Sequence, residues 1–400
     1  MTESRPLDGI RVIEVGQLLA GPFAGTLLGY FGAEVIKVEP PGTGDPIRSW
    51  RIVDAQGTSY WWRSLGRNKK SVTANLRSEA GRRVVKQLIE SADVVIENFK
   101  PGTMEKWELG PAQFETSNPT LIYARISGYG QTGPYAAKPG YASVTEAFSG
   151  FRHLNGFPGE APVRPNLSTG DTVAGLHAAL GILLALLERQ KPHSAQKGQV
   201  VDVALYEAMF NLMEGVVPEY SGSGEVRGAS GTTITGIVPT NTYRCKDEKY
   251  VVIGGNGDSI FVRLMRAIGR DDLADDPALR HNIGRVAQQQ MLDEAISAWT
   301  ASLTTAQVIA ALESADVPVG LIYDVEDMLA DPQYQARGMF EEVRLGEGSL
   351  TIPAILPKLA RTPGYTDWPG PELGAHRNEI LRSLGYSDRE IDELAAQGYV

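Results

Sequence analysis

The sequence places one carboxylate, that of Asp171, where it could act as a nucleophile. Asp171 ends the polar segment STGD and directly precedes the longest apolar helical segment of the chain. Aspartate is a common N-cap, so Asp171 could simply cap a helix that begins at Thr172. The dipole of such a helix would also keep the carboxylate ionised, and Asp171 could then act as a nucleophile. The local sequence leaves both interpretations open.

A second group of residues carries charge that could bind an anion. Arg67, Lys69, Lys70 and Arg77 form the densest basic patch of the chain. Lysine and arginine pair with phosphate oxygens, so the patch could be a phosphate site. A run of solvated charge is the simpler alternative, and the patch alone does not decide between them.

Two further segments lie where ligands usually bind. Lys100 and Lys106 come just after the expected strand ADVVIENF, and open parallel sheets bind ligands at the carboxyl ends of their strands. The segment Gly128–Gly150 is rich in glycine, which is typical of a backbone that turns sharply or approaches a ligand closely. A surface loop would explain its composition almost as well.

Alternating strands and helices must position these residues. Ile10–Val15 and Ala33–Pro40 are expected strands with a helix between them, which predicts a right-handed crossover and a parallel sheet. The fold class is therefore α/β, and the order resembles a dinucleotide-binding domain, with Glu39 near the end of the second strand. However, GQLLAGPFAG is not GxGxxG and has Pro22 where the phosphate turn would form. Nicotinamide binding is not expected.

The composition limits the class of protein. The chain has 400 residues, of which 42 % are hydrophobic, and its formal net charge is −10. This charge argues against generic binding to nucleic acid or anionic membranes. No signal peptide is recognisable, and no window is expected to reach the length of a membrane span. We expect a cytoplasmic protein with no nucleic-acid and no membrane partner.

The metal-binding residue types are sparse. Cys245 is the single cysteine, which excludes an intrachain disulfide and any cysteine metal cluster. The five histidines show no metal-ligand spacing, so no metal site is expected.

The chain is expected to form two domains. A run rich in Gly, Ser and Thr begins near residue 218. Residues 1–217 and 330–400 are predicted to form a large α/β domain, and residues 226–324 a smaller α+β domain that contains a β-hairpin. Residues 218–225 and 325–329 would be the linkers.

Several segments, taken in order, carry a family resemblance. They are PLDGIRVIEVGQLLAGPFAGTLLGYFGAEVIKVEPPGTGD, NKKSVTANL, ADVVIENFKPGTMEKWELG, ISGYGQTGP, STGDTVAGLHAALGILLALLER and KGQVVDVALYEA, with ADVPVGLIYDVEDMLADPQYQARGMF and LGAHRNEILRSLGYSDREI nearer the C-terminus. With them the chain resembles the class III coenzyme A transferases, which include formyl-CoA transferase and carnitine CoA-transferase. The resemblance implies a Rossmann-like large domain, a smaller domain and an interlocked-ring homodimer.

The resemblance also implies a mechanism. Asp171 matches the family's nucleophile, which attacks an acyl-CoA thioester to give an aspartyl anhydride and then a thioester intermediate. Gly170, the helix amides after Asp171 and the glycine-rich loops could donate hydrogen bonds to the oxyanion. Tyr141 matches a tyrosine of the acyl site, and Gly231 and Gly236 occupy the region of the loop that closes over the substrate.

Coenzyme A would be a substrate, with no tightly bound cofactor and no metal. The positions that match its contacts are Leu19, Ala20, Ala74, Asn75, Leu76, Arg77, Asn98, Phe99, Lys100 and Lys106.

Three departures from formyl-CoA transferase bear on specificity. Pro40 replaces an arginine that helps to bind CoA, and Ala142 stands where many relatives have an acidic residue. The run of consecutive glycines that closes over oxalate is absent. We therefore expect a dicarboxylyl-CoA such as succinyl-CoA, exchanging with another dicarboxylic or hydroxy acid. Arg152 or Arg164 could bind a distal carboxylate.

Two other functions compete with the transferase. The related α-methylacyl-CoA racemases pair the aspartate with a histidine, because two-base chemistry needs two titratable groups. Tyr141 stands where that histidine would be, and the high pKa of tyrosine makes it a poor base at neutral pH. A noncatalytic CoA-binding protein would keep the basic patch without needing Asp171.

Overall fold

The structure, a computed structural model, describes residues 4–400 and divides into two compact units. The first unit contains the chain up to Phe151, then Pro165–Glu214 and Ala336–Val400. The second contains Arg152–Arg164 and Gly215–Gln335. Both ends of the chain therefore contribute to the first unit.

The expected boundaries need more than one correction. Residues 152–164 were assigned to the large domain, but they lie in the second unit. The reason is a contact that sequence distance hides: the Gly231 amide donates to the Gly156 carbonyl at 2.9 Å, and the ring of Phe157 lies beside Gly231. The second unit also runs to Gln335, beyond the expected end at residue 324.

A six-stranded parallel sheet forms the centre of the first unit. Its strands are β1 (Arg11–Glu14), β2 (Glu34–Glu39), β3 (Lys69–Thr73), β4 (Val94–Glu97), β5 (Ile122–Ser127) and β6 (Val200–Ala204). The spatial order is β3-β2-β1-β4-β5-β6, and every neighbouring pair is parallel. The predicted α/β class is confirmed. In this order the chain direction across the sheet reverses between β1 and β4, which is where such sheets bind ligands.

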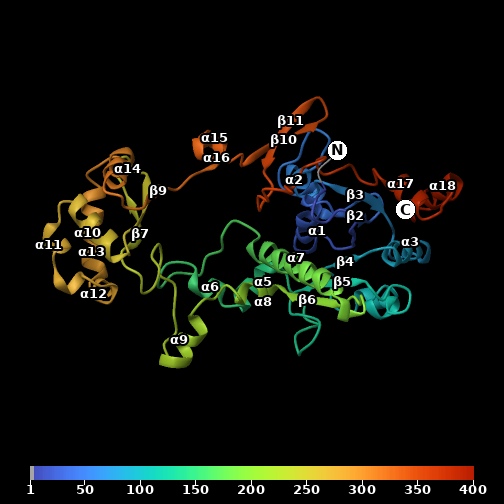
Figure 1. The fold of residues 1–400 in the computed structure, drawn as a ribbon, viewed down its shortest axis with the longest axis horizontal. Helices are drawn as coiled ribbons and strands as arrows, with labels where there is room; N and C mark the ends of the chain where they lie inside the picture. The colour runs from blue at the N-terminus through green and yellow to red at the C-terminus, as the bar shows by residue number, and fades with distance from the viewer. Residues whose placement is uncertain (1–3) are drawn as a thin grey trace. The chain divides into compact units, whose positions relative to one another are not determined.

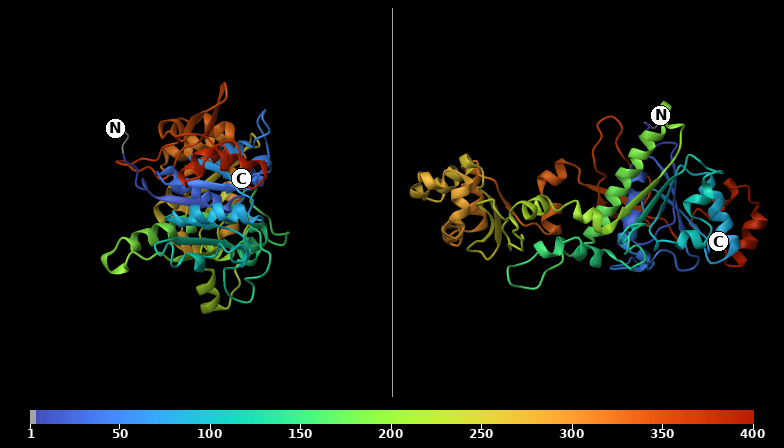
Figure 2. Two further views of the ribbon diagram at one scale, coloured as in Figure 1. Left: turned by 90° about the vertical axis from the view of Figure 1, so that its right-hand side faces the viewer. Right: turned by 90° about the horizontal axis from the view of Figure 1, so that it is seen from below.

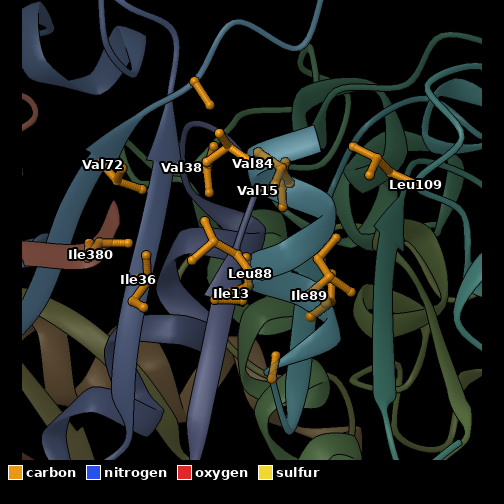
Figure 3. Close-up of a cluster of buried hydrophobic side chains, with 14 of the residues drawn as sticks. Ile13, Val15, Ile36, Val38, Val72, Val84, Leu88, Ile89, Leu109 and Ile380 are labelled. Atoms are coloured by element: carbon orange, nitrogen blue, oxygen red, sulfur yellow. The ribbon is translucent and has the colours of Figure 1, made fainter. Parts of the chain in front are cut away.

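Helices cover both faces of this sheet. The helix α1 (Ala20–Tyr30) and the helix α7 (Thr169–Arg189) share one buried cluster with Val12 of β1. Ile13, the next residue, packs on the other face with α3 (Glu79–Glu90), as the alternation of strand side chains requires. Figure 3 shows this second cluster, which also contains Ile380 from near the C-terminus.

The C-terminal segment completes that face. The helices α17 (Arg377–Ser383) and α18 (Asp388–Ala396) lie beside α3 and β3, far from them in sequence (Figure 1). The views in Figure 2 show the same neighbours from two other sides. The remaining α-helices and strands of this unit are α2 (Tyr60–Leu65), α4 (Thr103–Lys106), α5 (Ala142–Phe148), α8 (Leu205–Phe210) and the antiparallel pair β10 (Phe340–Leu345) and β11 (Gly348–Pro353).

The longest helix corrects an expectation about membrane spans. α7 has 21 residues and a mean hydropathy of 1.7 over an 18-residue window, so it is long and apolar enough to cross a membrane by length and composition. The glycines and the histidine in its sequence do not interrupt it, because α7 is one continuous helix. His177 Nδ1 lies 2.9 Å from the Val173 carbonyl, one turn earlier in the same helix. In the structure 44 % of this window is buried, and one face of α7 packs on α1 and the sheet.

The second unit is α+β. Its antiparallel sheet has the order β7-β8-β9, and the predicted hairpin joins β7 (Thr240–Arg244) to β8 (Tyr250–Gly254). The other elements are β9 (Val319–Leu321), α9 (Val216–Ser223), α10 (Asp258–Ala267), α11 (Asp271–Ala274), α12 (Asn282–Ala287), α13 (Gln289–Thr300), α14 (Thr305–Ser314), α15 (Val325–Ala330) and α16 (Pro332–Ala336). α6 (Phe151–Leu154) lies at the boundary between the units.

Candidate active site

Most of the residues expected to bind CoA lie at one edge of the parallel sheet. Leu19 and Ala20 follow β1, Ala74–Arg77 follow β3, and Asn98–Lys100 follow β4. In a parallel sheet these positions share the edge formed by the carboxyl ends of the strands, here on either side of the β1–β4 reversal. We call this the switch edge. Lys106 ends α4, just beyond the last of these segments.

The turns after β1 and β4 are tied together by one side chain. The Gln17 amide donates to Asn98 Oδ1 at 2.8 Å, and Asn98 Nδ2 donates to the Gln17 carbonyl at 2.8 Å. The fit is close, because a Cβ at Gly16 would lie only 2.5 Å from Asn98 Oδ1. Both polar ends of Asn98 are therefore engaged within the protein.

A buried group of charges lies beneath the turn after β1. Lys37 Nζ contacts Glu14 Oε1 at 2.9 Å and Asp45 Oδ2 at 2.8 Å, and it donates to the Gly16 carbonyl at 2.9 Å. Lys69 Nζ contacts Glu14 Oε2 at 2.7 Å. The four charged side chains, which we call the buried quartet, have no more than 1 % of their surface exposed. Each charge has an opposite charge beside it, as burial requires.

The two lysines of the buried quartet differ in pKa. Burial alone would lower the pKa of Lys37, but the carboxylates of Asp45 and Glu14 outweigh burial and raise it. Burial lowers the pKa of Lys69 to about 8, because Glu14 opposes the effect only in part and the charge of Lys37 adds to it. Lys69 is therefore the lysine of the quartet that loses its proton first as the pH rises.

The quartet fixes an unusual backbone conformation. Leu18 has φ of 64°, a left-handed conformation that is costly for a residue with a branched side chain. Its amide donates to Asp45 Oδ1 at 3.0 Å, so the same carboxylate that binds Lys37 also holds this turn. Leu19 and Ala20, which follow it, are buried with 6 % and 2 % of their surface exposed.

Neither interpretation of the basic patch fits three of its four residues. Lys69 belongs to the buried quartet, and Arg67, which is 1 % exposed, donates to the Ser64 and Pro353 carbonyls. Lys70 pairs with Glu34 and Glu379. These three cations stabilise the fold, because they form ion pairs or hydrogen bonds with residues that are distant in the sequence. Of the patch, only Arg77 is exposed.

The acidic residue at the end of β2 is also engaged. Glu39 is 1 % exposed, and Arg48 donates to both of its carboxylate oxygens, at 2.6 and 2.7 Å. Arg48 lowers the pKa of Glu39 against the opposing effect of burial. This bidentate pair leaves no oxygen facing a ribose, in keeping with the absence of the dinucleotide motif.

The other segments of the switch edge are held in place by hydrogen bonds and by side-chain packing. The Asn75 amide donates to the Tyr399 carbonyl at 2.8 Å, and Asn75 Oδ1 accepts from the Arg77 amide. Leu76 packs against the buried cluster of α3. After β4, the ring of Phe99 packs edge-on against Trp107, with ring centres 5.1 Å apart. The side chains of Lys100 and Lys106 are exposed.

The expected helix start at Thr172 is wrong. α7 begins at Thr169 with Ser168 as the N-cap, so Asp171 lies inside the first turn instead of at the cap. The Ser168 side chain makes no capping bond. Instead, Oε1 of Glu146, a buried residue of α5, accepts from the Gly170 amide at 3.1 Å. A cap that comes from another helix leaves no local sequence signal.

The first turns of α7 lie beside the start of α1. A Cβ at Gly175 would lie 2.8 Å from the Ala20 carbonyl oxygen, so the two helices touch where only a glycine fits. Asp171 is four residues earlier and therefore lies on the same face of α7, one turn closer to its N-terminus. Asp171 therefore lies one helical turn from the contact between α7 and the start of α1. It is half-buried there.

Two of the expected oxyanion donors are already used. The Gly170 amide donates to Glu146, and the Thr172 amide donates to the Ser168 carbonyl at 3.0 Å. That Gly170 belongs to the acyl site stays a prediction, and in this structure its amide is engaged by Glu146.

The residues expected in the acyl site are divided between the units. Tyr141 is the N-cap residue of α5 and is 75 % exposed. Gly231 and Gly236 belong to the second unit, where both have positive φ, 68° and 77°. Arg152 and Arg164 belong to the second unit as well.

The glycine-rich segment carries a cluster that the sequence analysis missed. Gly128 and Gly140 touch, since a Cβ on Gly128 would lie 2.9 Å from Gly140 Cα, and this contact closes the segment into a loop. The aromatic rings of Tyr129, Tyr135, Phe148 and Tyr206 pack against one another beside it, with centres 5.2 to 6.1 Å apart. The frequent tyrosines of this region were the feature of the sequence that could have predicted this aromatic cluster.

Metal ligands are not gathered in this part of the protein or elsewhere in the described residues. Within 4–400, no group of three or more His, Cys, Asp or Glu side chains could hold a metal ion.

Comparison with known proteins defines the class. The family described as "CoA-transferase family III" matches residues 7–377. Succinyl-CoA–D-citramalate CoA-transferase of Chloroflexus aurantiacus is 44 % identical over 98 % of this chain and 98 % of its own length. The alpha subunit of succinyl-CoA–L-malate CoA-transferase of Chloroflexus aurantiacus is 40 % identical over 99 % and 92 %. A CaiB/BaiF family protein from Brucella suis, of known crystal structure, matches with a TM-score of 0.84 at 33 % identity, over 96 % of this chain and 100 % of that one.

The chain belongs to CoA-transferase family III, which confirms the resemblance. It is an enzyme that transfers coenzyme A, and CoA thioesters are its substrates.

Proposed function

We propose that the enzyme transfers CoA from succinyl-CoA to a second dicarboxylic or hydroxy acid, with Asp171 as the nucleophile. The observation that carries this proposal is the place of Asp171, in the first turn of α7 and one helical turn from the contact between Gly175 and Ala20 at the switch edge. The amides and dipole of a helix N-terminus stabilise a carboxylate there. The two Chloroflexus relatives are named for succinyl-CoA and a hydroxy dicarboxylic acid, which supports the substrate class.

The first half of the reaction takes CoA from the donor. The Asp171 carboxylate attacks the thioester carbonyl, the C–S bond breaks, and CoA leaves as a thiolate, so that an acyl-aspartyl anhydride remains. The thiolate then attacks the Asp171 carbonyl of the anhydride. This step releases the free acid of the donor and leaves CoA joined to Asp171 as a thioester.

The second half repeats these steps in reverse. The acceptor carboxylate attacks the Asp171 thioester, CoA leaves again as a thiolate, and its attack on the acceptor carbonyl gives the new acyl-CoA and restores Asp171. Each step exchanges one anionic nucleophile for one anionic leaving group. Because no proton is transferred, the cycle needs no general base, and Tyr141 has no proton-transfer role in it.

A substrate panel tests the proposal directly. We expect succinyl-CoA, incubated with a series of carboxylic acids, to yield the CoA thioesters of dicarboxylic and hydroxy dicarboxylic acids, measured by mass spectrometry. Products formed only from monocarboxylic acids would contradict the substrate class. Deuterium exchange at the α-carbon of an acyl-CoA, without movement of CoA to a second acid, would instead indicate racemase chemistry.

Asn98→Ala is expected to weaken the binding of the CoA donor. The change removes two hydrogen bonds between the turns after β1 and β4, each contributing about 1 kcal/mol. The KM for acyl-CoA should rise about 5- to 30-fold, with a smaller change in kcat. Steady-state kinetics with varied donor concentration measures this.

Asn118→Ala is the matched control. Asn118 also makes two side-chain hydrogen bonds to the backbone, donating to the carbonyls of Ile89 and Ala92, but it precedes β5 and so lies at the opposite edge of the sheet. Its loss should lower the melting temperature and leave the KM unchanged. Equal KM values for wild type and Asn98→Ala would contradict the role of the switch edge in binding CoA.

We also propose a homodimer. One face of α7 exposes apolar side chains at helical spacing, namely Leu176, Leu180, Leu183, Leu184 and Leu187, each with 37 to 61 % of its surface exposed. An apolar face of this size usually contacts another protein surface. Sedimentation equilibrium should give twice the mass of the chain, and a monomer at micromolar concentration would contradict this proposal.

A further inference from the structure

The carboxylate of Glu146 meets the helix that carries Asp171. Glu146 lies on α5 with none of its surface exposed, and its Oε1 accepts from the Gly170 amide at 3.1 Å. Gly170 directly precedes Asp171. A buried carboxylate requires strong hydrogen bonds, and an amide at a helix N-terminus is a favourable donor.

The contact is specific to this place on α7. Ser168, the N-cap residue, makes no side-chain bond to the helix, so Glu146 supplies a cap from outside. The approach of the two helices is also tight, because a Cβ at Gly170 would lie 3.1 Å from Glu146 Cγ and 3.2 Å from Ala142 Cβ. The first turn of α7 is therefore held against α5 both by packing and by a hydrogen bond.

We propose that Glu146 is a positioning residue for Asp171, which acts by fixing the Gly170 peptide through this hydrogen bond. The inference rests on the proposed nucleophilic role of Asp171. Attack on a thioester requires the carboxylate oxygen at a defined distance and angle, and the Gly170 peptide sets the direction of the Asp171 side chain. A displacement of about 1 Å can cost two orders of magnitude in rate.

Three substitutions separate the hydrogen bond from the charge. Glu146→Gln keeps an acceptor oxygen at the same position and removes the charge. Glu146→Asp keeps the charge but withdraws the acceptor by about one bond length, roughly 1.5 Å. Glu146→Ala removes both. If the hydrogen bond positions Asp171, the glutamine variant should keep most of the activity and the other two should be much slower.

The expected result is a selective loss of kcat. Glu146→Ala and Glu146→Asp should lower kcat about 10- to 100-fold with a KM for succinyl-CoA within about threefold of wild type, whereas Glu146→Gln should remain within about fivefold in kcat. Ser387→Ala is the control, because it removes the cap of α18, a helix far from Asp171 in sequence and on the other face of the sheet. Its kcat should match the wild type.

Amide hydrogen exchange provides a readout that does not depend on activity. The peptide covering residues 168–174 should exchange faster in Glu146→Ala than in Glu146→Gln, with the wild type slowest or equal to the glutamine variant. If Asp171→Ala retained full transfer, the proposed function would fail, yet the exchange would still show whether Glu146 holds the turn.

Two results would overturn the proposal. One is a kcat for Glu146→Ala within twofold of wild type. The other is a glutamine variant as slow as the alanine variant, which would assign the effect to charge. If Glu146→Ala did not fold, the comparison of Glu146→Gln with Glu146→Asp would decide in the same way.

Discussion

Asp171→Ala is expected to lower kcat by about 10⁴-fold or more, the size of effect seen when an enzyme's nucleophile is removed. Alanine has no oxygen with which to form the anhydride, so both halves of the transfer stop. The binding of acyl-CoA at the switch edge should persist, with a dissociation constant close to that of the wild type. Mass-spectrometric detection of the new acyl-CoA measures the rate, and calorimetry measures the binding.

The covalent intermediate offers a second test of the same residue. Wild-type enzyme quenched in acid after mixing with succinyl-CoA should carry a mass increase on the peptide that contains Asp171, and Asp171→Ala should carry none. Asp388→Ala is the control, since Asp388 is also an acidic residue in the first turn of a helix, α18, and is exposed. Transfer by Asp171→Ala within tenfold of wild type would contradict the mechanism and leave Asp171 a structural residue.

Lys37→Met is expected to destabilise the first unit by about 3–5 kcal/mol, the usual cost of removing one partner from a buried ion pair. The change leaves Glu14 with Lys69 as its one remaining cation and deprives Asp45 of its lysine. Methionine has nearly the same volume, so a cavity is not the cause. Urea unfolding followed by tryptophan fluorescence measures the effect, because five of the six tryptophans, all except Trp299, lie in the first unit.

An exposed pair provides the comparison for the buried quartet. Arg389 and Glu393 are four residues apart on α18 and contact at 3.0 Å with 86 % and 57 % of their side-chain surface exposed. Arg389→Met should change the free energy of unfolding by less than about 0.5 kcal/mol. If Lys37→Met were equally mild, the quartet would not stabilise the turn that precedes Leu19 and Ala20.

The strand pattern of the sheet was predictable from sequence, and its charged residues were not. Strands such as Ile10–Val15 are apolar on both faces, which identifies a covered parallel sheet directly. Lys69 instead looked like part of a surface patch. It is buried because Glu14, 55 residues earlier, lies on a strand of the same sheet and faces it. No local pattern reports a pairing across that separation.

The position of Asp171 shows the same limit at the candidate active site. Family resemblance singled out the residue, and local rules predicted a helix beginning after it. The helix begins two residues before it, because Glu146 of α5 satisfies the Gly170 amide that a local cap would otherwise satisfy. Glu146 itself gave no signal, since one glutamate in a short helix has the same appearance whether it faces solvent or a neighbouring helix.

The two hydrogen bonds between Gln17 and Asn98 have a consequence for the thermodynamics of CoA binding. Both bonds are made within the protein, so the fold itself holds the two turns at the β1–β4 reversal and the nucleotide is not needed to order them. The two turns lose their conformational entropy when the protein folds, so ordering them does not weaken the binding of CoA. Titration calorimetry of CoA should therefore show a heat-capacity change that matches the apolar area covered by the ligand alone, with no added contribution from the ordering of a loop.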